Sequence, residues 1–300
     1  MQPNESKSKL WNGALEYLKK SRYSWWNEDY LEFLIEKVWK ITEAVSVIDF
    51  GCGIGFLGEI LLPLLPEGSS YTGVDIGDKL LEEAKRIFED KKYETHFIYA
   101  DVCDFETEKK YDIAISQAVF QHIENPIPVL ERMKDSVVEG GLVIAMDVSR
   151  DMNSSALYID GFDYSKLNLL GIEQKLRRNI LEETNKDFEI GLKLPVHMKK
   201  IGLKNVDIRL NDYVQCFDSI DSDYIEQYEA FTTGQYEKLF TEDMKDSFIK
   251  NIVSKGLTQE EAEKLFYGQQ EITSFIHKNR NNISVVKSMC MLISYGYSFV

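Results

Sequence analysis

The sequence predicts an α/β protein built on a parallel sheet with helices on both of its faces. Three observations lead to this fold class: short apolar runs alternate with helix-length segments, glycines follow the first of these runs, and 300 residues suffice for a sizeable core. The composition, 44% hydrophobic and 28% charged, is that of an ordinary globular protein. Short strands separated by helices imply crossover connections, so the strands should be buried on both faces.

The elements of the first half follow in order. Asn27 can cap a helix in which Leu31, Leu34, Ile35 and Val38 recur at helical spacing. The strands and helices expected after it are strand Val45–Phe50, helix Phe56–Leu65, strand Tyr71–Asp75, a helix from Asp78, strand Thr95–Ala100, strand Asp112–Ser116, a helix from Pro126 and strand Leu142–Asp147.

The second half is less regular. We expect a helix near Gly191–Ile201, a strand Val206–Asn211, a helical stretch over 213–285 and a final strand from Ser288 to Val300. A chain that returns to strand at its end after a helical excursion suggests that the excursion is an insertion. The sequence therefore predicts three parts: an N-terminal helical cap (1–44), an α/β domain (45–212 plus 286–300) and a helical insertion or lid (213–285).

Charge and cysteine usage exclude several classes. With 35 basic and 50 acidic residues the formal net charge is −15, a field that repels polyanions, so we expect no nucleic-acid partner. Four scattered cysteines without a CxxC pair argue against a disulfide framework and a structural zinc site. Neither a signal peptide nor an apolar stretch of the ~20 residues needed to cross a bilayer is visible. We expect a cytoplasmic protein without a metal or a membrane segment.

The sharpest local pattern is the turn after the first strand. Asp49 ends a buried strand, and Gly51, Gly53 and Gly55 stand at alternate positions before the next helix. Glycine lets the backbone approach a ligand closely, and a helix start offers unpaired N–H groups. The pattern predicts a nucleotide-like ligand at the carboxyl ends of the strands. A tight turn without a ligand is the alternative.

Two further acidic residues follow neighbouring strands. Asp75 closes the second strand, about 20 residues beyond the glycines, where a carboxylate can accept ribose hydroxyls. Asp101 ends the third strand, in a place to meet a purine edge. Both could instead be solvated acids, because Asp is common where strands end.

A dinucleotide site is a competing interpretation. Gly53, Gly55 and Gly58 satisfy G-x-G-x-x-G, which by itself is weak evidence for an NAD-dependent dehydrogenase. The glycines begin at Gly51, however, and Asp49 already stands within the strand, where its charge would repel a pyrophosphate. A cosubstrate with a cationic amino-acid end would be attracted there, so the sign of the charge disfavours NAD.

The segment Val47–Gly58 resembles the first motif of class I S-adenosylmethionine-dependent methyltransferases, an acid followed by Gly-x-Gly-x-Gly. The resemblance continues in order through Tyr71–Ile76, Tyr99–Val102, Tyr111–Ile123 and Val138–Val143. It implies a doubly wound, seven-stranded, mostly parallel sheet of the methyltransferase, Rossmann-like type. Strands near 206–211 and 288–299 would form its antiparallel edge.

The resemblance also implies contacts with S-adenosyl-L-methionine. The residues that would approach its methionine end are Asp49, Gly51, Cys52 and Gly53, with Asp49 near the ammonium. Asp75 would bind the ribose and Ile76 would pack on adenine, while Asp101 and Val102 would fix the adenine amino group and ring. Ser116 and Gln117 would line the floor of the site beside the sulfonium. We expect Cys52 to be a small packed residue, because methyl transfer needs no covalent intermediate.

The acceptor side is less determined. Methyl transfer is an in-line displacement that requires alignment and exclusion of water, so no obligatory base can be named. His122 is the candidate for catalysis, with a structural role as the alternative. Tyr23, Trp26 and Tyr30, together with the insertion, could wall off an acceptor pocket or simply pack between helices.

We therefore predict an enzyme that methylates O or N of a small molecule. The alternatives are a protein that binds S-adenosylmethionine or a partner without catalysis, and the NAD-dependent dehydrogenase.

Overall fold

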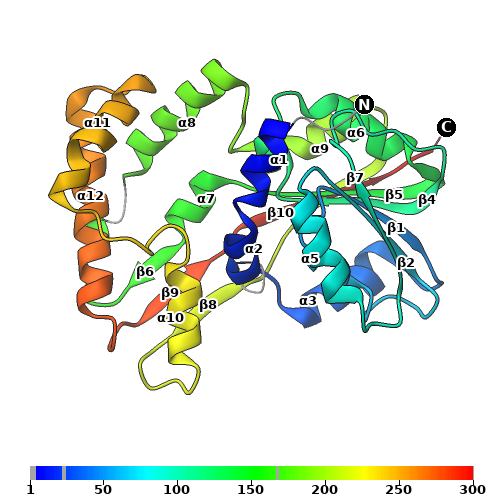
Figure 1. The fold of residues 1–300 in the computed structure, drawn as a ribbon, viewed down its shortest axis with the longest axis horizontal. Helices are drawn as coiled ribbons and strands as arrows, with labels where there is room; N and C mark the ends of the chain where they lie inside the picture. The colour runs from blue at the N-terminus through cyan, green and yellow to red at the C-terminus, as the bar shows by residue number, and fades with distance from the viewer. Residues whose placement is uncertain (1–4, 22–24, 167–168, 300) are drawn as a thin grey trace.

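A computed structural model describes residues 5–21, 25–166 and 169–299. Its main sheet has seven strands: β1 (Ser46–Phe50), β2 (Ser70–Asp75), β3 (Glu94–Tyr99), β4 (Tyr111–Gln117), β5 (Val137–Val148), β7 (Lys204–Leu210) and β10 (Met291–Tyr297). They lie in the order β3-β2-β1-β4-β5-β10-β7 (Figure 1). The first five run parallel, and β10 is antiparallel to both of its neighbours. The predicted doubly wound sheet with an antiparallel edge is confirmed.

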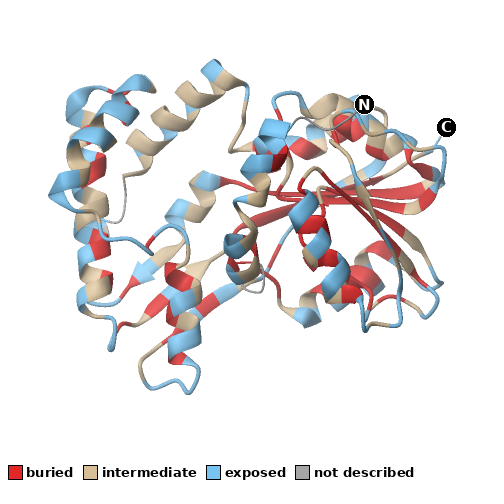
Figure 2. Cartoon of the chain, viewed as in Figure 1, coloured by how far each residue is buried: buried red, intermediate tan, exposed pale blue. Residues whose placement is uncertain are grey.

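Helices cover both faces of this sheet because its strands carry apolar side chains on each side. In β1, Val47 packs into the core on one face, whereas Ile48 and Phe50 pack into the core on the other, as the two-residue period of a strand requires. The first face is covered by α3 (Glu28–Phe33), the π-helical segment Leu34–Trp39, α4 (Phe56–Leu61) and α5 (Asp78–Phe88), and the second by α6 (Pro126–Asp135) and α9 (Ile190–Lys200). Figure 2 shows the sheet as the most continuously buried part of the chain.

Three local expectations differ from the structure. The stretch 213–285, expected to be helical, contains strand β8 (Val214–Phe217) and ends where strand β9 (Val285–Ser288) begins. Asn27 stands at the N-cap of α3, but its side chain does not cap the helix; its Nδ2 donates to Asp212 Oδ1 at 3.2 Å. Helix α4 ends at Leu61, not at Leu65, because Pro63 has no N–H to continue the hydrogen-bond ladder and restricts the residue before it.

A second, smaller sheet lies beyond the N-terminal end of β10 (Figure 1). Its strands β6 (Leu157–Ile159), β9 (Val285–Ser288) and β8 (Val214–Phe217) pair antiparallel in that order. Around it lie α7 (Arg150–Ser155), α8 (Leu170–Thr184), α10 (Tyr224–Thr232), α11 (Lys245–Ser254) and α12 (Gln259–Lys278), with two apolar cores separate from those of the main sheet. We call these elements the accessory unit. It draws β6 from the segment after β5 as well as elements from 213–285, and the exact division into cap, domain and insertion stays a prediction.

Two N-terminal helices, α1 (Glu5–Asn12) and α2 (Leu15–Ser21), lie across the carboxyl edge of the main sheet (Figure 1). Within the described ranges, no helix is both long enough and apolar enough to cross a membrane.

Candidate functional site

The glycine turn is clamped to the end of β2. The N–H groups of Gly51 and Cys52 donate to the carbonyl of Val74 at 2.8 and 3.1 Å, and that of Gly53 donates to Asp75 Oδ2 at 2.8 Å. Gly51 has a φ of +84°, and a Cβ there would lie 2.4 Å from a methyl of Val119, so only glycine fits. These hydrogen bonds and the close contact with Val119 hold the turn in one shape.

Asp75 lies between two backbone segments at this edge. Its Oδ2 accepts from Gly53, and its Oδ1 accepts from the N–H of Gly77 at 2.7 Å. The residue is buried, 8% exposed. A carboxylate oxygen can accept more than one hydrogen bond, so a side chain held in this way is chemically suited to accept from hydroxyl groups as well.

Asp49 is almost completely buried, and Tyr71 holds it. The Tyr71 hydroxyl donates to Asp49 Oδ2 at 2.6 Å. Burial, together with the negative charge of Asp49, raises the pKa of Tyr71 well above its usual value. The tyrosine therefore stays protonated and keeps donating. No local sequence pattern marks Tyr71 as the partner of Asp49, because the contact comes from the strand register that places Val47 opposite Tyr71.

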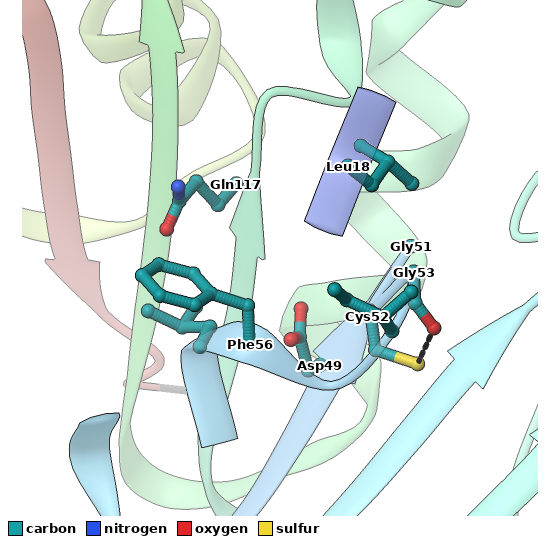
Figure 3. A pocket seen from close by; sticks show the side chains of 9 residues that line it. Leu18, Asp49, Gly51, Cys52, Gly53, Phe56 and Gln117 are labelled. Atoms are coloured by element: carbon teal, nitrogen blue, oxygen red, sulfur yellow. Dashed lines mark hydrogen bonds between the residues drawn. The ribbon is translucent and has the colours of Figure 1, made fainter. Parts of the chain in front are cut away.

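A pocket opens directly above Asp49 (Figure 3). Its lining residues are Leu18, Asp49, Gly51, Cys52, Gly53, Ile54, Phe56, Leu57 and Gln117, around an empty volume of about 330 Å³. Asp49 is the single charged side chain of that lining, so the pocket favours a cationic group. Leu18 comes from α2, a contribution that no sequence pattern indicated.

Cys52 lines the same pocket as a neutral thiol. Its Sγ donates to the carbonyl of Gly53 at 3.7 Å. Burial, with the negative charges of Asp75 and Asp49, raises the pKa of the thiol well above its usual value. A thiol kept protonated is a poor nucleophile, which agrees with a packing role for Cys52.

The far wall of the pocket joins β4 to the N-terminal region. Gln117 is buried at the end of β4, and its Oε1 accepts from Trp26 Nε1 at 3.3 Å. Ser116 is fully buried and donates to the carbonyl of Phe50 at 2.9 Å, so its hydroxyl supports β1 instead of lining the pocket. Tyr30 donates to the carbonyl of Leu210 at 2.9 Å, at the end of β7, and is likewise outside the lining. Tyr23 lies outside the described residues.

Helix α1 covers the adjacent ends of β2 and β3. Lys7 Nζ lies 3.0 Å from Asp101 Oδ2, and Asn12 Nδ2 donates to Asp78 Oδ1 at 2.6 Å. Burial opposes the ionisation of Asp101, but the Cys103 N–H and Lys7 together hold its pKa below the usual range. Val102 is buried and Ile76 half-buried next to these carboxylates in sequence. The acids that end the strands are thus brought to one edge.

His122 lies on the surface, in the 3₁₀ turn Phe120–His122 that follows β4. Its ring meets that of Trp11 edge-on, with centroids 4.8 Å apart. This contact links the turn to α1, and the catalytic role of His122 stays a hypothesis.

Residues 41–188 match a family model described as a methyltransferase domain. This part of the chain, just under half of it, belongs to that methyltransferase-domain family. The chain is 24% identical over 165 residues to a ubiquinone biosynthesis O-methyltransferase of Rickettsia felis, covering 50% of this chain and 66% of that protein. It is 25% identical over 229 residues to the enzyme of that name from Rickettsia bellii, covering 67% of this chain and 92% of that one. The matched region thus spans just under two thirds of the length of the Rickettsia felis relative.

The fold of the chain is similar to that of phosphoethanolamine N-methyltransferase 2 from Haemonchus contortus, solved with phosphomonomethylethanolamine and S-adenosylhomocysteine. The TM-score is 0.53 at 13% identity, over 98% of this chain and 59% of that one. This similarity concerns the fold alone. The family match leaves the NAD-dependent dehydrogenase interpretation without support.

Proposed function

We propose that this protein transfers a methyl group from S-adenosyl-L-methionine to O or N of a small-molecule acceptor. The observation that carries the proposal is the buried carboxylate of Asp49, held by Tyr71 beneath a pocket walled by glycine backbone. An α-ammonium group is the complement that such a pocket favours, because a negative charge in a poorly solvated place attracts a cation strongly.

The remaining strand ends suit the rest of the cosubstrate. Asp75 is suited to accept from ribose hydroxyls, and Ile76 and Val102 offer apolar contact to a purine. Asp101 can accept from the purine amino group through Oδ1 or Oδ2, which requires it to share its bonds with Cys103 and Lys7. When bound, S-adenosylmethionine would supply a methyl group bonded to a sulfonium sulfur. That sulfur is a good leaving group, because it departs as a neutral thioether.

The protein's own residues align the acceptor with the methyl group and exclude water. Leu18 and Phe56 line the pocket, and Trp26 closes on Gln117 beside it. These side chains exclude water from the place where the transferred methyl would lie, which favours attack by a positioned acceptor over hydrolysis. Methylation of an O–H or N–H acceptor releases one proton, and His122 is the candidate residue to accept it.

The names of the curated relatives, O-methyltransferases of ubiquinone biosynthesis, support oxygen as the acceptor atom. Nitrogen stays within the proposal. The cytoplasmic location and the absence of a nucleic-acid partner stay predictions.

Calorimetry with S-adenosylmethionine and S-adenosylhomocysteine tests the cosubstrate. Asp75→Ala should weaken binding by ~1–3 kcal/mol, the loss of charge-assisted hydrogen bonds. The control is Asp112→Ala at the opposite end of the sheet, where the carboxylate accepts from the N–H of Ser46 at 2.7 Å; this variant should keep the wild-type affinity. Equal affinities of the two variants would show that the ribose is misplaced.

A turnover assay then separates an enzyme from a binding protein. Release of S-adenosylhomocysteine in the presence of a panel of phenols, catechols and amines is the expected result. Tight binding of the cosubstrate without release in any mixture would favour the non-catalytic alternative.

A further inference from the structure

Among the residues that the structure describes, two cations of the accessory unit, Lys287 and Arg150, have no carboxylate partner. Lys287 lies on β9, the central strand of the small sheet, on the same face as the buried Val285. Its Nζ lies 5.5 Å from the ring centroid of Phe231 and 5.7 Å from that of Tyr236. Across the parts of the chain that the structure describes, no hydrogen bond or ion pair engages this ammonium group. Lysine is rarely placed among apolar side chains unless it is paired.

Arg150 is the second cation. It begins α7, and its Nη2 donates to Gln121 Oε1 at 2.8 Å, which directs the guanidinium. Desolvation, with the positive charge of Arg150, lowers the pKa of Lys287 to about 8. Among the described residues, no carboxylate lies within ion-pair distance of Arg150.

Carboxylates are nevertheless close by, and a different cation uses them. Arg177 on α8 pairs with Asp151, with Glu173 at 3.4 Å and with Glu189 at 3.7 Å. Acidic residues outnumber basic ones by 50 to 35 in the chain. Among the described residues, Lys287 and Arg150 are therefore without an acidic partner even though acidic side chains are abundant in the chain.

The segments that carry both cations adjoin the carboxyl edge of the main sheet, the edge that also holds the pocket. Gln121, which holds Arg150, follows the pocket residue Gln117 closely in sequence, and Arg150 stands just past the carboxyl end of β5. Lys287 comes shortly before β10, whose first residue, Met291, pairs with Val148 at that end of β5. Figure 1 shows the small sheet and α7 next to this edge.

We propose that Lys287 and Arg150 bind an anionic group, a carboxylate or a phosphate, on the acceptor, with Phe231 and Tyr236 as the apolar wall beside it. The inference rests on the proposed methyl transfer, because it assigns the acceptor side of the same site. An anion supplies the counter-charge that a poorly solvated ammonium lacks. The guanidinium presents two parallel N–H donors, the geometry that carboxylates and phosphates accept.

The first test needs no cosubstrate. Benzoate and inorganic phosphate are titrated into the full-length protein in a non-coordinating buffer, and binding is followed by calorimetry at constant ionic strength. We expect at least one anion to bind the wild type, and Lys287→Met and Arg150→Gln to weaken it by about tenfold or more, as for the loss of a charge-assisted bond. Lys250→Met, which removes an exposed lysine of α11, is the matched control and should bind as the wild type does.

A second comparison identifies the source of the anion. Protein loaded with S-adenosylhomocysteine is titrated with 3,4-dihydroxybenzoate against its amide, and with O-phosphoethanolamine against ethanolamine. The charged member of at least one pair should bind more tightly, and Lys287→Arg should retain the preference that Lys287→Met loses.

Absence of binding by both simple anions, or equal binding to wild type and Lys287→Met, would overturn the inference. In each variant S-adenosylmethionine should bind with unchanged affinity. Failure of the anion site with normal cosubstrate binding is therefore distinct from failure of the proposed function.

Discussion

Replacing Lys287 by methionine should stabilise the folded protein near neutral pH. The pKa of Lys287 falls from 10.5 to about 8 on folding, and at 1.36 kcal/mol per unit this caps the cost of the buried charge at ~3 kcal/mol. Partial exposure of the side chain reduces this cost, and the two aromatic contacts return ~0.5–1 kcal/mol each. We expect a net gain of ~1 kcal/mol for Lys287→Met at pH 7.

The sign of the pH dependence follows from the same shift. Between about pH 8 and pH 10.5 the unfolded chain binds more protons at this lysine than the native protein does. The contribution of Lys287 to the free energy of unfolding therefore rises with pH across this window. The titratable groups around it are Arg150, Tyr236 and, beyond Tyr236, Glu173. The variant should lose this rise, so its advantage over the wild type should shrink between pH 7 and pH 10.

Urea unfolding of both proteins at pH 7 and pH 10, in a buffer without phosphate, measures the effect. Phosphate is left out because an anion that binds the native site would stabilise the wild type by mass action. Lys250→Met serves as the control for removing one positive charge. A less stable Lys287→Met at pH 7, or an unchanged difference from wild type at both pH values, would refute the reasoning.

Three further perturbations test other parts of the structure. In Gly58→Ala the new Cβ would lie 2.7 Å from the Tyr71 ring; displacement of the ring should cost ~1–3 kcal/mol in urea unfolding and weaken S-adenosylmethionine binding through Asp49, whereas unchanged affinity would dissociate Tyr71 from the site. Thr258→Ala removes the side chain that caps α12 and should cost ~1 kcal/mol of stability with no change in cosubstrate affinity, so a change in affinity would contradict a purely structural cap. Burial raises the pKa of Asp147 to about 6, so between pH 4 and pH 6 the native protein binds more protons at this group than the unfolded chain does. The contribution of Asp147 to the free energy of unfolding therefore falls by at most ~3 kcal/mol as the pH rises. Asp147→Asn should remove that fall, and parallel curves of stability against pH for the variant and the wild type would exclude the raised pKa.

Much of the site could be predicted because its parts are local in sequence. An acid that ends a buried strand, followed by glycines at alternate positions, determines where the chain must turn and which groups it presents there. The same holds for Asp75, because the parallel sheet brings the carboxyl ends of its strands to one edge. The strand order and the antiparallel partner of the last strand followed from the resemblance to a known family.

Local sequence patterns predict poorly where two interactions compete for one side chain. Asn27 is a residue type that commonly caps helices, but its side-chain amide donates to Asp212 instead. A capping preference is worth ~1 kcal/mol, and one tertiary hydrogen bond can outweigh it. Thr258, whose partner Glu261 lies within the same turn, forms a complete capping box.

The sequence by itself therefore determined the strands and helices of the main sheet, the glycine turn and the carboxylates at the strand ends, since each of these depends on residues close together in the chain. Only the tertiary structure decided which residues contact them and how the small sheet forms: Tyr71 under Asp49, Leu18 over the pocket, Lys7 on Asp101, and Lys287 against Phe231 and Tyr236. Such contacts join segments far apart in sequence, and strand register and helix packing select them, so no local pattern of residues announces them.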